Sequence, residues 1–342
     1  MTPNGGMKTN TASNTASDPR RAALEEWCAR ELRTPRPRLA VASADASARR
    51  YFRVHVGDET YIAMDAPDQH ESLAAFLRVA ELMQAAGVNV PRIFAQDLER
   101  GYLLLTDMGR ETYLDVLPGR DPRGLFDAAT AELLRWQVAT RPGALPEFSA
   151  ELLRTELELF PVWYLERHRG ITLAVVRRRE VERIFDAIVE RVGSQPRVFV
   201  HRDYMPRNLL VGDPAPGVID FQDAVLGPVT YDAVSLYRDA FISWPESFVT
   251  EGLRRYWTEA QKADLPVPPS FGDFLTECRW MGVQRHLKVL GIFARLHYRD
   301  NKPGYLADAP RFIGYLREAV AADPELAETL APLFPWLDKE EG

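Results

Sequence analysis

Hydrophobic and polar residues alternate in short runs over the first hundred residues of the chain and recur at helical spacing over the rest. Three short runs rich in β-branched and aromatic residues are separated by turn residues, and they predict antiparallel strands at 38–44, 49–57 and 59–67. An amphipathic stretch over 70–87 predicts a helix, and 92–109 predicts a β-hairpin. The chain is therefore expected to open with a small sheet.

Longer helical periodicity begins after this hairpin and predicts helices at about 121–140, 149–168 and 176–192. The segment 197–221 interrupts them with strand-like runs, and helices resume near position 230. Before the sheet, Asp18 and Pro19 are typical of an N-cap and a first helical residue. These patterns predict an α+β protein with two lobes. A tail at 1–17, expected to be disordered, precedes an N-lobe at 18–107 and a larger, mostly helical C-lobe at 108–342.

Composition narrows the class of protein. The 342 residues are 46% hydrophobic, which suits a folded core, and the net charge of −7 gives no general field for nucleic acid. Only Cys28 and Cys278 are present, without a zinc-ligand pattern, and no run of 18 apolar residues or secretory leader occurs. We expect a cytoplasmic protein without membrane, nucleic-acid or obligate protein partners.

Three polar side chains in the interrupting segment are candidates for catalysis. Asp203 is followed by Asn208 five positions later and by Asp220 after a further strand-like run. Phosphoryl transfer needs a carboxylate to take the acceptor's proton and hard oxygen ligands for Mg²⁺. Asp203 suits the first role, and Asn208 with Asp220 suits the second. The alternative is that all three only cap turns.

Longer stretches around these residues resemble the aminoglycoside phosphotransferase and choline kinase family, namely "HRDYMPRNLLV", "GVIDFQDAVLGPVTYDAVSL" and "LLLTDMG". The resemblance covers roughly 40–300 and implies a two-lobed, protein-kinase-like fold that uses ATP and Mg²⁺. It also implies that Asp203 is the base and that Asn208 and Asp220 are metal ligands. Asp232 would brace the catalytic loop, although an N-cap is an equal alternative.

Within that family, "DASARRYFRV", "YIAMDAP" and "RWMGVQRHLKVLGIFARLHYRD" resemble the kinases of bacterial cell-wall recycling. Those enzymes phosphorylate the anomeric hydroxyl of N-acetylmuramate or N-acetylglucosamine. The resemblance therefore implies an ATP-dependent amino-sugar kinase of peptidoglycan recycling. Asp220 is followed by Phe-Gln and no A-P-E segment occurs downstream, which favours a small-molecule acceptor over a protein.

The nucleotide site departs from the superfamily pattern, because no lysine lies between Lys8 and Lys262 and Met64 stands where the strand lysine aligns. Our hypothesis is that Arg53, or else Arg49 or Arg50, replaces that lysine. The alternative is that these arginines only coat an edge strand. The remaining candidate nucleotide contacts are Ser43 and Ser47 in the opening loop and, by resemblance, the backbone of Thr106, Asp107 and Met108.

The sequence indicates the residues that contact the acceptor substrate less clearly than the catalytic residues. Gln222 and Asp223 come shortly after Asp220, so they could reach hydroxyl groups of an acceptor beside Asp203. The alternative is that they only form a turn. In the last long helical stretch one stripe is core, formed by Trp280, Val283, Leu287 and Leu290, and another face carries Lys288, Arg295 and Arg299. An acidic sugar would need a cation, and this basic face, together with Arg238 and Arg285, offers candidates. For the face that carries Lys288, Arg295 and Arg299, a solvated helix surface is the favoured interpretation.

Two other functions fit the same residues. The first is a kinase of another small alcohol, such as an aminoglycoside or choline, whose cationic acceptor calls for acidic or aromatic contacts. The second is a nucleotide-binding pseudokinase, which the missing lysine suggests. Intact Asp203, Asn208 and Asp220 favour an active enzyme.

Overall fold

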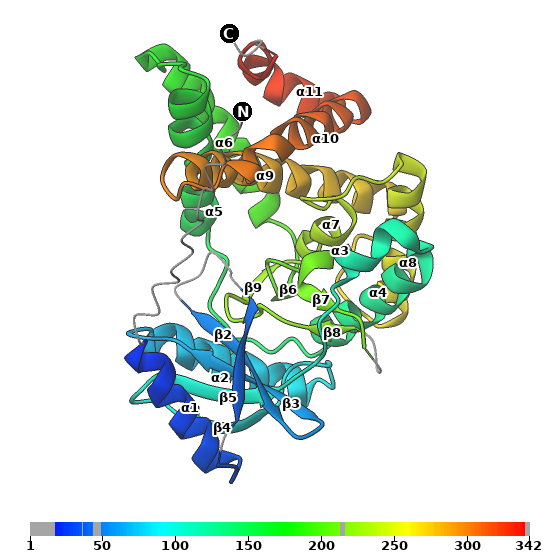
Figure 1. Ribbon diagram of the computed structural model, residues 1–342. Helices are drawn as coiled ribbons and strands as arrows, with labels where there is room; N and C mark the ends of the chain where they lie inside the picture. The colour runs from blue at the N-terminus through cyan, green and yellow to red at the C-terminus, as the bar shows by residue number, and fades with distance from the viewer. Residues whose placement is uncertain (1–17, 36, 44–48, 213–215, 339–342) are drawn as a thin grey trace, which may run out of the picture. The chain divides into compact units, whose positions relative to one another are not determined.

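The computed structural model describes residues 18–35, 37–43, 49–212 and 216–338, so the expected disordered tail at 1–17 lies outside the description. The chain separates into two compact units (Figure 1). The first combines the chain up to Leu73 with Arg92–Asp107, and the second combines Ala74–Pro91 with Met108 onwards.

The first unit is built on a five-stranded antiparallel sheet with the strand order β1-β2-β3-β5-β4. Its strands are β1 (Arg38–Ser43), β2 (Arg50–Val56), β3 (Glu59–Asp65), β4 (Ile93–Asp97) and β5 (Tyr102–Thr106). The three predicted strands and the predicted hairpin are therefore confirmed, since their alternating patterns match a sheet with two distinct faces.

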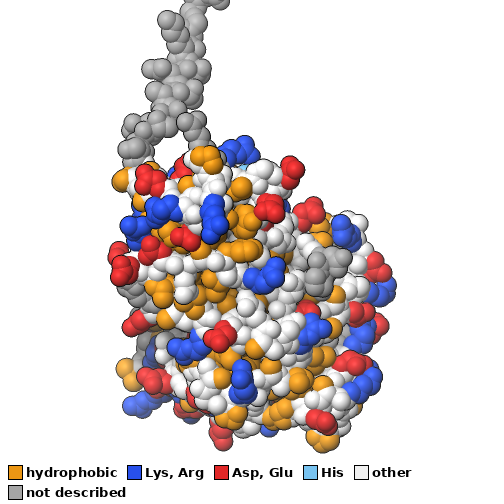
Figure 2. All heavy atoms as spheres, turned by 90° about the horizontal axis from the view of Figure 1, so that it is seen from below, with side chains coloured by type: hydrophobic (Ala, Val, Ile, Leu, Met, Phe, Trp, Pro, Cys, Tyr) orange, Lys and Arg blue, Asp and Glu red, His pale blue; other side chains and the backbone are white. Residues whose placement is uncertain are grey.

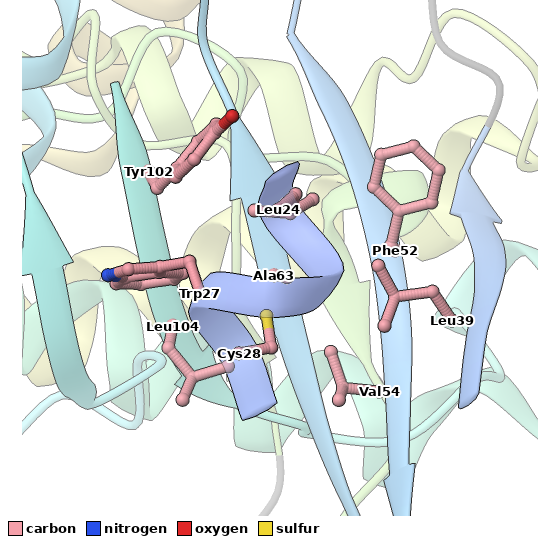
Figure 3. Packing of buried hydrophobic residues seen from close by; sticks show 9 residues of the cluster. All are labelled: Leu24, Trp27, Cys28, Leu39, Phe52, Val54, Ala63, Tyr102 and Leu104. Atoms are coloured by element: carbon pink, nitrogen blue, oxygen red, sulfur yellow. The ribbon is translucent and has the colours of Figure 1, made fainter. Parts of the chain in front are cut away.

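Helix α1 (Pro19–Glu31) covers one face of this sheet (Figure 3). Its N-cap is Asp18, whose side chain accepts the backbone N–H groups of Arg20 and Arg21 at 3.1 and 3.0 Å, as predicted. The buried cluster beneath the helix consists of Leu24, Trp27 and Cys28 from α1 and Leu39, Phe52, Val54, Ala63, Tyr102 and Leu104 from the strands. These apolar side chains are buried against α1. Because side chains alternate along a strand, the residues between them point to the opposite face of the sheet.

Helix α2 (His70–Ala85) begins in the first unit and continues in the second. Phe76 stacks on Phe221 with ring centroids 4.8 Å apart, and the N–H of Val218 donates to the carbonyl of Asn89 at 2.8 Å. Sequence analysis placed this stretch in the N-lobe, but these contacts group 74–91 with the second unit. Helical periodicity alone does not tell which partner an apolar face will meet.

The second unit is mostly helical. Its α-helices are α3 (Tyr113–Val116), α4 (Pro122–Val138), α5 (Ala150–Leu157), α6 (Val175–Gly193), α7 (Tyr231–Tyr237), α8 (Glu246–Lys262), α9 (Phe271–Tyr298), α10 (Ala309–Ala322), α11 (Pro324–Leu330) and α12 (Phe334–Leu337). Short 3₁₀ turns are η1 (Leu117–Gly119), η3 (Pro206–Asn208), η4 (Pro303–Asp308) and η5 (Ala331–Leu333). The predicted helix at 149–168 divides into α5 and a π-helical turn, η2 (Phe160–His168), near Pro161, which lacks the N–H that a continuous helix would use.

Helix α9 runs through the centre of the helical unit beside α6, α7, α10 and η2 (Figure 1). The predicted core stripe is confirmed, because Trp280, Val283, Leu287 and Leu290 are all at most 1% exposed. The helix is covered on more than this one stripe, however, and Lys288 is also buried at 8% exposure. The expectation of a solvated basic face was therefore wrong for Lys288.

Two short ladders interrupt the helices and carry the candidate catalytic residues. Strand β6 (Arg197–Val200) pairs with β9 (Val225–Pro228), and β7 (Leu209–Leu210) pairs with β8 (Gly217–Val218), both antiparallel. The β7–β8 hairpin was predicted. Strand β9 was missed, because its Gly-Pro pair is typical of a loop.

Charged side chains of both signs are mixed over the face drawn in Figure 2, in keeping with the modest net charge. In the ranges that the structure covers, no helix is long and apolar enough to span a bilayer. Cys28 and Cys278 are both buried and both free.

Candidate active site

The structure brings Asp203, Asn208 and Asp220 together at the ends of the two short ladders of the second unit. Buried strand β6 leads into the loop that carries Asp203. The Nδ2 of Asn208 donates to the carbonyl of Asp203 at 2.9 Å, and the N–H of Ile219 donates to the carbonyl of Asn208 at 3.1 Å. Because Asp220 follows Ile219 directly, these two bonds tie the three residues into one cluster.

His201 is the residue that sequence reasoning missed at the centre of this cluster. Its Nδ1 accepts the backbone N–H of Asp203 at 3.2 Å, and its Nε2 donates to the carbonyl of Ile219 at 3.1 Å. Both bonds are satisfied by the neutral ring with its proton on Nε2. Complete burial lowers the pKa of His201, while Asp203 and Asp220 oppose this shift, so the ring stays neutral and links the two acidic segments.

Asn208 and Asp220 have the donor atoms that Mg²⁺ prefers. The amide nitrogen of Asn208 donates to the carbonyl of Asp203, so the amide oxygen is the atom of this side chain that could bind a metal. Asp220 is exposed and has a φ of +62°, a left-handed conformation that costs a non-glycine residue about 1 kcal/mol or more. The described part of the chain contains no group of three or more His, Cys, Asp or Glu side chains able to hold a metal. A pair of protein oxygens completed by phosphate and water is the usual Mg²⁺ arrangement.

Asp232 braces the loop that carries Asp203. The carboxylate of Asp232 is completely buried and accepts the N–H groups of His201 at 2.6 Å and Arg202 at 3.0 Å. Arg202 has a φ of +76°, so these bonds hold a backbone turn that a side chain rarely adopts. The brace reading is favoured over the N-cap, since the N-cap of α7 is Thr230.

The Asp232 brace predicts a pH dependence of stability. Burial raises the pKa of this carboxyl from 3.8 to about 7, against the pull of its two N–H donors. The folded protein therefore keeps a proton that the unfolded chain loses, and the free energy of unfolding should fall as the pH rises from 4 to 7. Relative to Asp232→Asn, we expect an extra slope of at most about 1.4 kcal/mol per pH unit in chemical denaturation. Parallel pH profiles for the two proteins would contradict this.

Arg202 is also held by its side chain. Its guanidinium pairs with Glu156 of α5, which is 5% exposed. Glu156 also accepts Nζ of Lys288 at 2.8 Å and Nε2 of Gln284 at 3.1 Å, and Lys288 reaches the hydroxyl of Tyr231 at 3.1 Å. Burial would raise the pKa of Glu156, but Lys288 and Arg202 hold it below its ordinary value. This buried network fixes the residue just before Asp203.

Gln222 and Asp223 lie next to Asp220, as their place in the sequence requires. Gln222 is 7% exposed, and its Nε2 donates to Oδ1 of Asp220 at 2.9 Å and to Oδ2 of Asp223 at 3.3 Å. Asp223 is exposed. Gln222 therefore orients the carboxylate of Asp220, in addition to any contact that it makes with an acceptor.

The structure does not place Arg238 and Arg285, the candidate cations for an acidic acceptor, in contact with the cluster of Asp203, Asn208 and Asp220. Arg285 is 2% exposed and donates to the carbonyl of Arg238 at 3.3 Å, which argues for a core role. The guanidinium of Arg238 pairs with Glu246 and Glu318 in a pocket that Cys278 also lines. Both placements argue against direct contact with an acceptor at Asp203. On the basic face of α9, Arg299 is exposed and paired with Asp300, and Arg295 is half-buried.

The first unit holds the candidate nucleotide residues except Met108, which belongs to the second unit. Arg53 lies between Phe52 and Val54, which face α1, so its side chain points to the opposite face of the sheet. There Nε and Nη2 of Arg53 contact the two oxygens of Asp107 at 2.5 and 3.0 Å. Arg53 pairs across the ladder with Ile62, two residues from Met64 on the same face. This arrangement makes Arg53 a cation close to the position of the missing lysine.

The other candidate nucleotide contacts have different surroundings from Arg53. Arg50 is held by the completely buried Asp65 at 2.5 Å and by Asp18, and Arg20 contacts the same Asp65 at 2.7 Å, so Arg50 anchors the start of β2. Ser47 and the side chain of Ser43 lie outside the described residues. The N–H of Thr106 donates to the carbonyl of Arg92 at 2.9 Å. The side chain of Met108 packs where a Cβ on Gly217 would come within 2.7 Å of it.

The sequence contains only weak indications of the site features that sequence analysis missed. Glu156 stands at a core position of its helix, between Leu153 and Phe160, where an acid predicts a buried partner. Sequence analysis named Lys288 but missed its burial, for which the only signal was that apolar residues lie on more than one side of its helix. No local pattern marks His201 apart from its place two residues before Asp203.

Comparison with known proteins agrees with this architecture. The model of the phosphotransferase enzyme family matches residues 38–265, which is more than half of the chain, and the chain belongs to this family. The chain is similar to proteins named N-acetylmuramate/N-acetylglucosamine kinase. It is 55% identical to that of Pseudomonas aeruginosa over 86% of this chain and 87% of the relative, and 41% identical to that of Neisseria meningitidis over 94% and 97%.

Solved structures show the same fold at low sequence identity. The chain resembles an ADP-bound aminoglycoside phosphotransferase with a TM-score of 0.59 and 13% identity, over 86% of this chain and 97% of the other. It also resembles the choline kinase LicA from Streptococcus pneumoniae with a TM-score of 0.62 and 12% identity, over 88% and 99%. The expected kinase-like α+β fold is thereby confirmed.

Proposed function

We propose that this protein transfers the γ-phosphoryl group of ATP to the anomeric hydroxyl of N-acetylmuramate or N-acetylglucosamine, as part of peptidoglycan recycling in the cytoplasm. The observation that carries the proposal is the cluster of Asp203, Asn208 and Asp220 joined through His201. Similarity to kinases named for these two sugars supports the acceptor, and two free, buried cysteines are compatible with a reducing compartment.

Each residue of the cluster has a distinct task in this proposal. The Asp203 carboxylate accepts the proton of the attacking hydroxyl and orients its oxygen toward the phosphorus. The amide oxygen of Asn208 and the carboxylate of Asp220 hold Mg²⁺, which neutralises charge on the phosphates when it is bound. Gln222 fixes Asp220 through the 2.9 Å bond, and Asp232 fixes the loop of Asp203.

We further propose that the first unit contributes Arg53 to the nucleotide. Asp107 holds the guanidinium of Arg53 in a bidentate pair, which presets its orientation before ATP binds. Backbone groups of the Thr106–Met108 stretch would contact adenine, and the N–H of Thr106 is already used by Arg92. Ser43 and Ser47 stay candidates for hydroxyl contacts to the phosphates.

Arg53→Met tests this nucleotide role. We expect the KM for ATP to rise about tenfold, the size of one charge-assisted hydrogen bond, with a smaller effect on the KM for sugar. Arg38→Gln is the matched control, because Arg38 is an exposed arginine of the edge strand β1. Equal KM values for ATP in Arg53→Met and wild type would reduce Arg53 to a stabilising residue of the first unit.

A coupled assay of ADP formation tests the function itself. The full-length protein is supplied with MgATP and, in turn, N-acetylmuramate, N-acetylglucosamine, choline and an aminoglycoside, and products are identified by ³¹P NMR. We expect ADP and a sugar 1-phosphate with the N-acetylated sugars only. Turnover of choline or the aminoglycoside would favour the other small-alcohol kinases, and nucleotide binding without any turnover would favour a pseudokinase.

A further inference from the structure

Helix α7 connects the catalytic loop to the centre of the helical unit. It lies beside α9, and every residue from Tyr231 to Tyr237 is buried (Figure 1). Asp232, in the first turn of α7, braces the catalytic loop, because its carboxylate accepts the N–H groups of His201 and Arg202. A completely buried carboxylate has lost the solvation of its charge, so this brace depends on the charges that surround it.

A second buried aspartate holds the turn that follows α7. Asp239 is completely buried, and its Oδ1 accepts the N–H groups of Phe241 at 2.7 Å and Ile242 at 2.9 Å. Within the ranges that the structure describes, Oδ2 of Asp239 has no hydrogen-bond partner. Both ends of α7 therefore carry a buried acid, and each acid accepts a pair of backbone N–H groups.

Arg285 of α9 is the buried cation that acts on both acids. It is 2% exposed, and its Nη1 donates at 3.3 Å to the carbonyl of Arg238, the residue directly before Asp239. A guanidinium stays protonated in proteins, so its burial places a permanent positive charge in the core. Burial raises the pKa of Asp232 to about 7 and also raises the pKa of Asp239, and the charge of Arg285 opposes both shifts.

The other groups that face these two acids act on one of them each. For Asp232, the N–H groups of His201 and Arg202 favour the ionised carboxylate, and the charge of Asp203 favours the protonated form. For Asp239, the backbone N–H groups of residues 240–242 favour the ionised form. An ionised carboxylate accepts hydrogen bonds roughly twice as strong as those of a neutral acceptor. The charge of Arg285 therefore strengthens the bonds at both ends of α7.

We propose that Arg285 is a positioning residue for phosphoryl transfer, because its buried charge strengthens the hydrogen bonds through which Asp232 holds the loop of Asp203 and Asp239 holds the turn after α7. This inference rests on the proposed function. In it Arg285 does not contact the acceptor, which changes the role that sequence analysis gave to this residue.

Arg285→Gln tests the effect of the charge, because glutamine still has a donor for the carbonyl of Arg238. The turnover number is measured as sugar-dependent ADP release from about pH 6 to pH 9. We expect turnover to fall about tenfold near pH 7, with an unchanged KM for ATP. The rise of turnover with pH should move up by about one unit, because Asp232 needs a higher pH to ionise without the cation. Arg285→Lys keeps the charge and should restore the wild-type profile.

Two controls separate this charge from general damage to α9. Arg279→Gln removes a half-buried arginine of the same helix, and its turnover and pH profile should equal those of wild type. Asp232→Asn removes the carboxyl on which Arg285 acts at the catalytic loop. Adding Arg285→Gln to Asp232→Asn should therefore leave the pH profile unchanged and lower turnover by less than about threefold.

The possible failures can be told apart. If Arg285→Gln matches wild type, or lowers turnover without moving the pH profile, Arg285 only packs the core and the inference is wrong, while the proposed kinase function stands. If Arg285→Gln does not fold, the double variant decides, and a further tenfold loss relative to Asp232→Asn would overturn the inference. If wild type phosphorylates neither sugar, the proposed function is wrong, and the inference is overturned with it.

Discussion

Asp203→Asn is expected to lower the turnover number about 10³-fold on either sugar, because asparagine cannot accept the proton of the attacking hydroxyl. Stability should change little. The carbonyl of Asp203 that accepts Asn208 and the N–H that donates to His201 are backbone groups, and both persist in the variant. The measurement is the initial rate of sugar-dependent ADP release at saturating MgATP, alongside the melting temperature.

Asp186→Asn is the matched control for this experiment, since Asp186 is an exposed acid of α6 paired with Arg154, and its turnover should match that of wild type. If Asp203→Asn kept more than about a tenth of the wild-type turnover, Asp203 would not be the base. The proposal that Asn208 and Asp220 bind the metal would then lose its main support.

Glu156→Leu is expected to lower the free energy of unfolding by about 3–5 kcal/mol, because it leaves two buried cations without their shared carboxylate. The side chains of Lys288 and Arg202 are only 10% and 19% exposed, so neither charge is well solvated in the folded protein. Since Arg202 precedes Asp203 at a strained φ, turnover should also fall, even in the fraction that is still folded. Chemical denaturation and the rate of ADP release measure the two effects.

The double variant Glu156→Leu/Lys288→Met separates charge from packing. It removes one of the stranded cations, so we expect it to recover about 2 kcal/mol relative to Glu156→Leu. Glu158→Gln is the control. Glu158 is two residues away and pairs with Arg178 where both side chains are about one third exposed, so less than about 1 kcal/mol is expected. Equal destabilisation by Glu156→Leu and Glu158→Gln would contradict the role of the buried network.

The same network explains how the catalytic loop keeps its shape. The two residues before Asp203 donate their N–H groups to Asp232, and the guanidinium of Arg202 is anchored on Glu156. Backbone and side chain are therefore fixed by two different buried carboxylates. We expect such a loop to be ordered without ligand, because its polar groups are satisfied inside the protein.

The features of this protein that depend on short-range geometry could be predicted from its amino-acid sequence. Alternation at 38–67 fixed three strands, Asp18 and Pro19 fixed the start of α1, and the short span from Asp203 to Asp220 brought the catalytic candidates together through a local hairpin. A strand alternates with period two and a hairpin joins neighbouring segments, so both can be inferred from nearby residues alone.

Which charged side chains are buried, and which partners they pair with, depends on how distant segments pack together. Arg53 meets Asp107 across 54 positions, Arg202 meets Glu156 across 46, and Lys288 meets the same Glu156 across 132. Sequence analysis placed Lys288 on a solvated face because a helical wheel describes one helix at a time. Whether a polar face meets water or another helix depends on packing between distant segments, and local residue patterns do not encode that information.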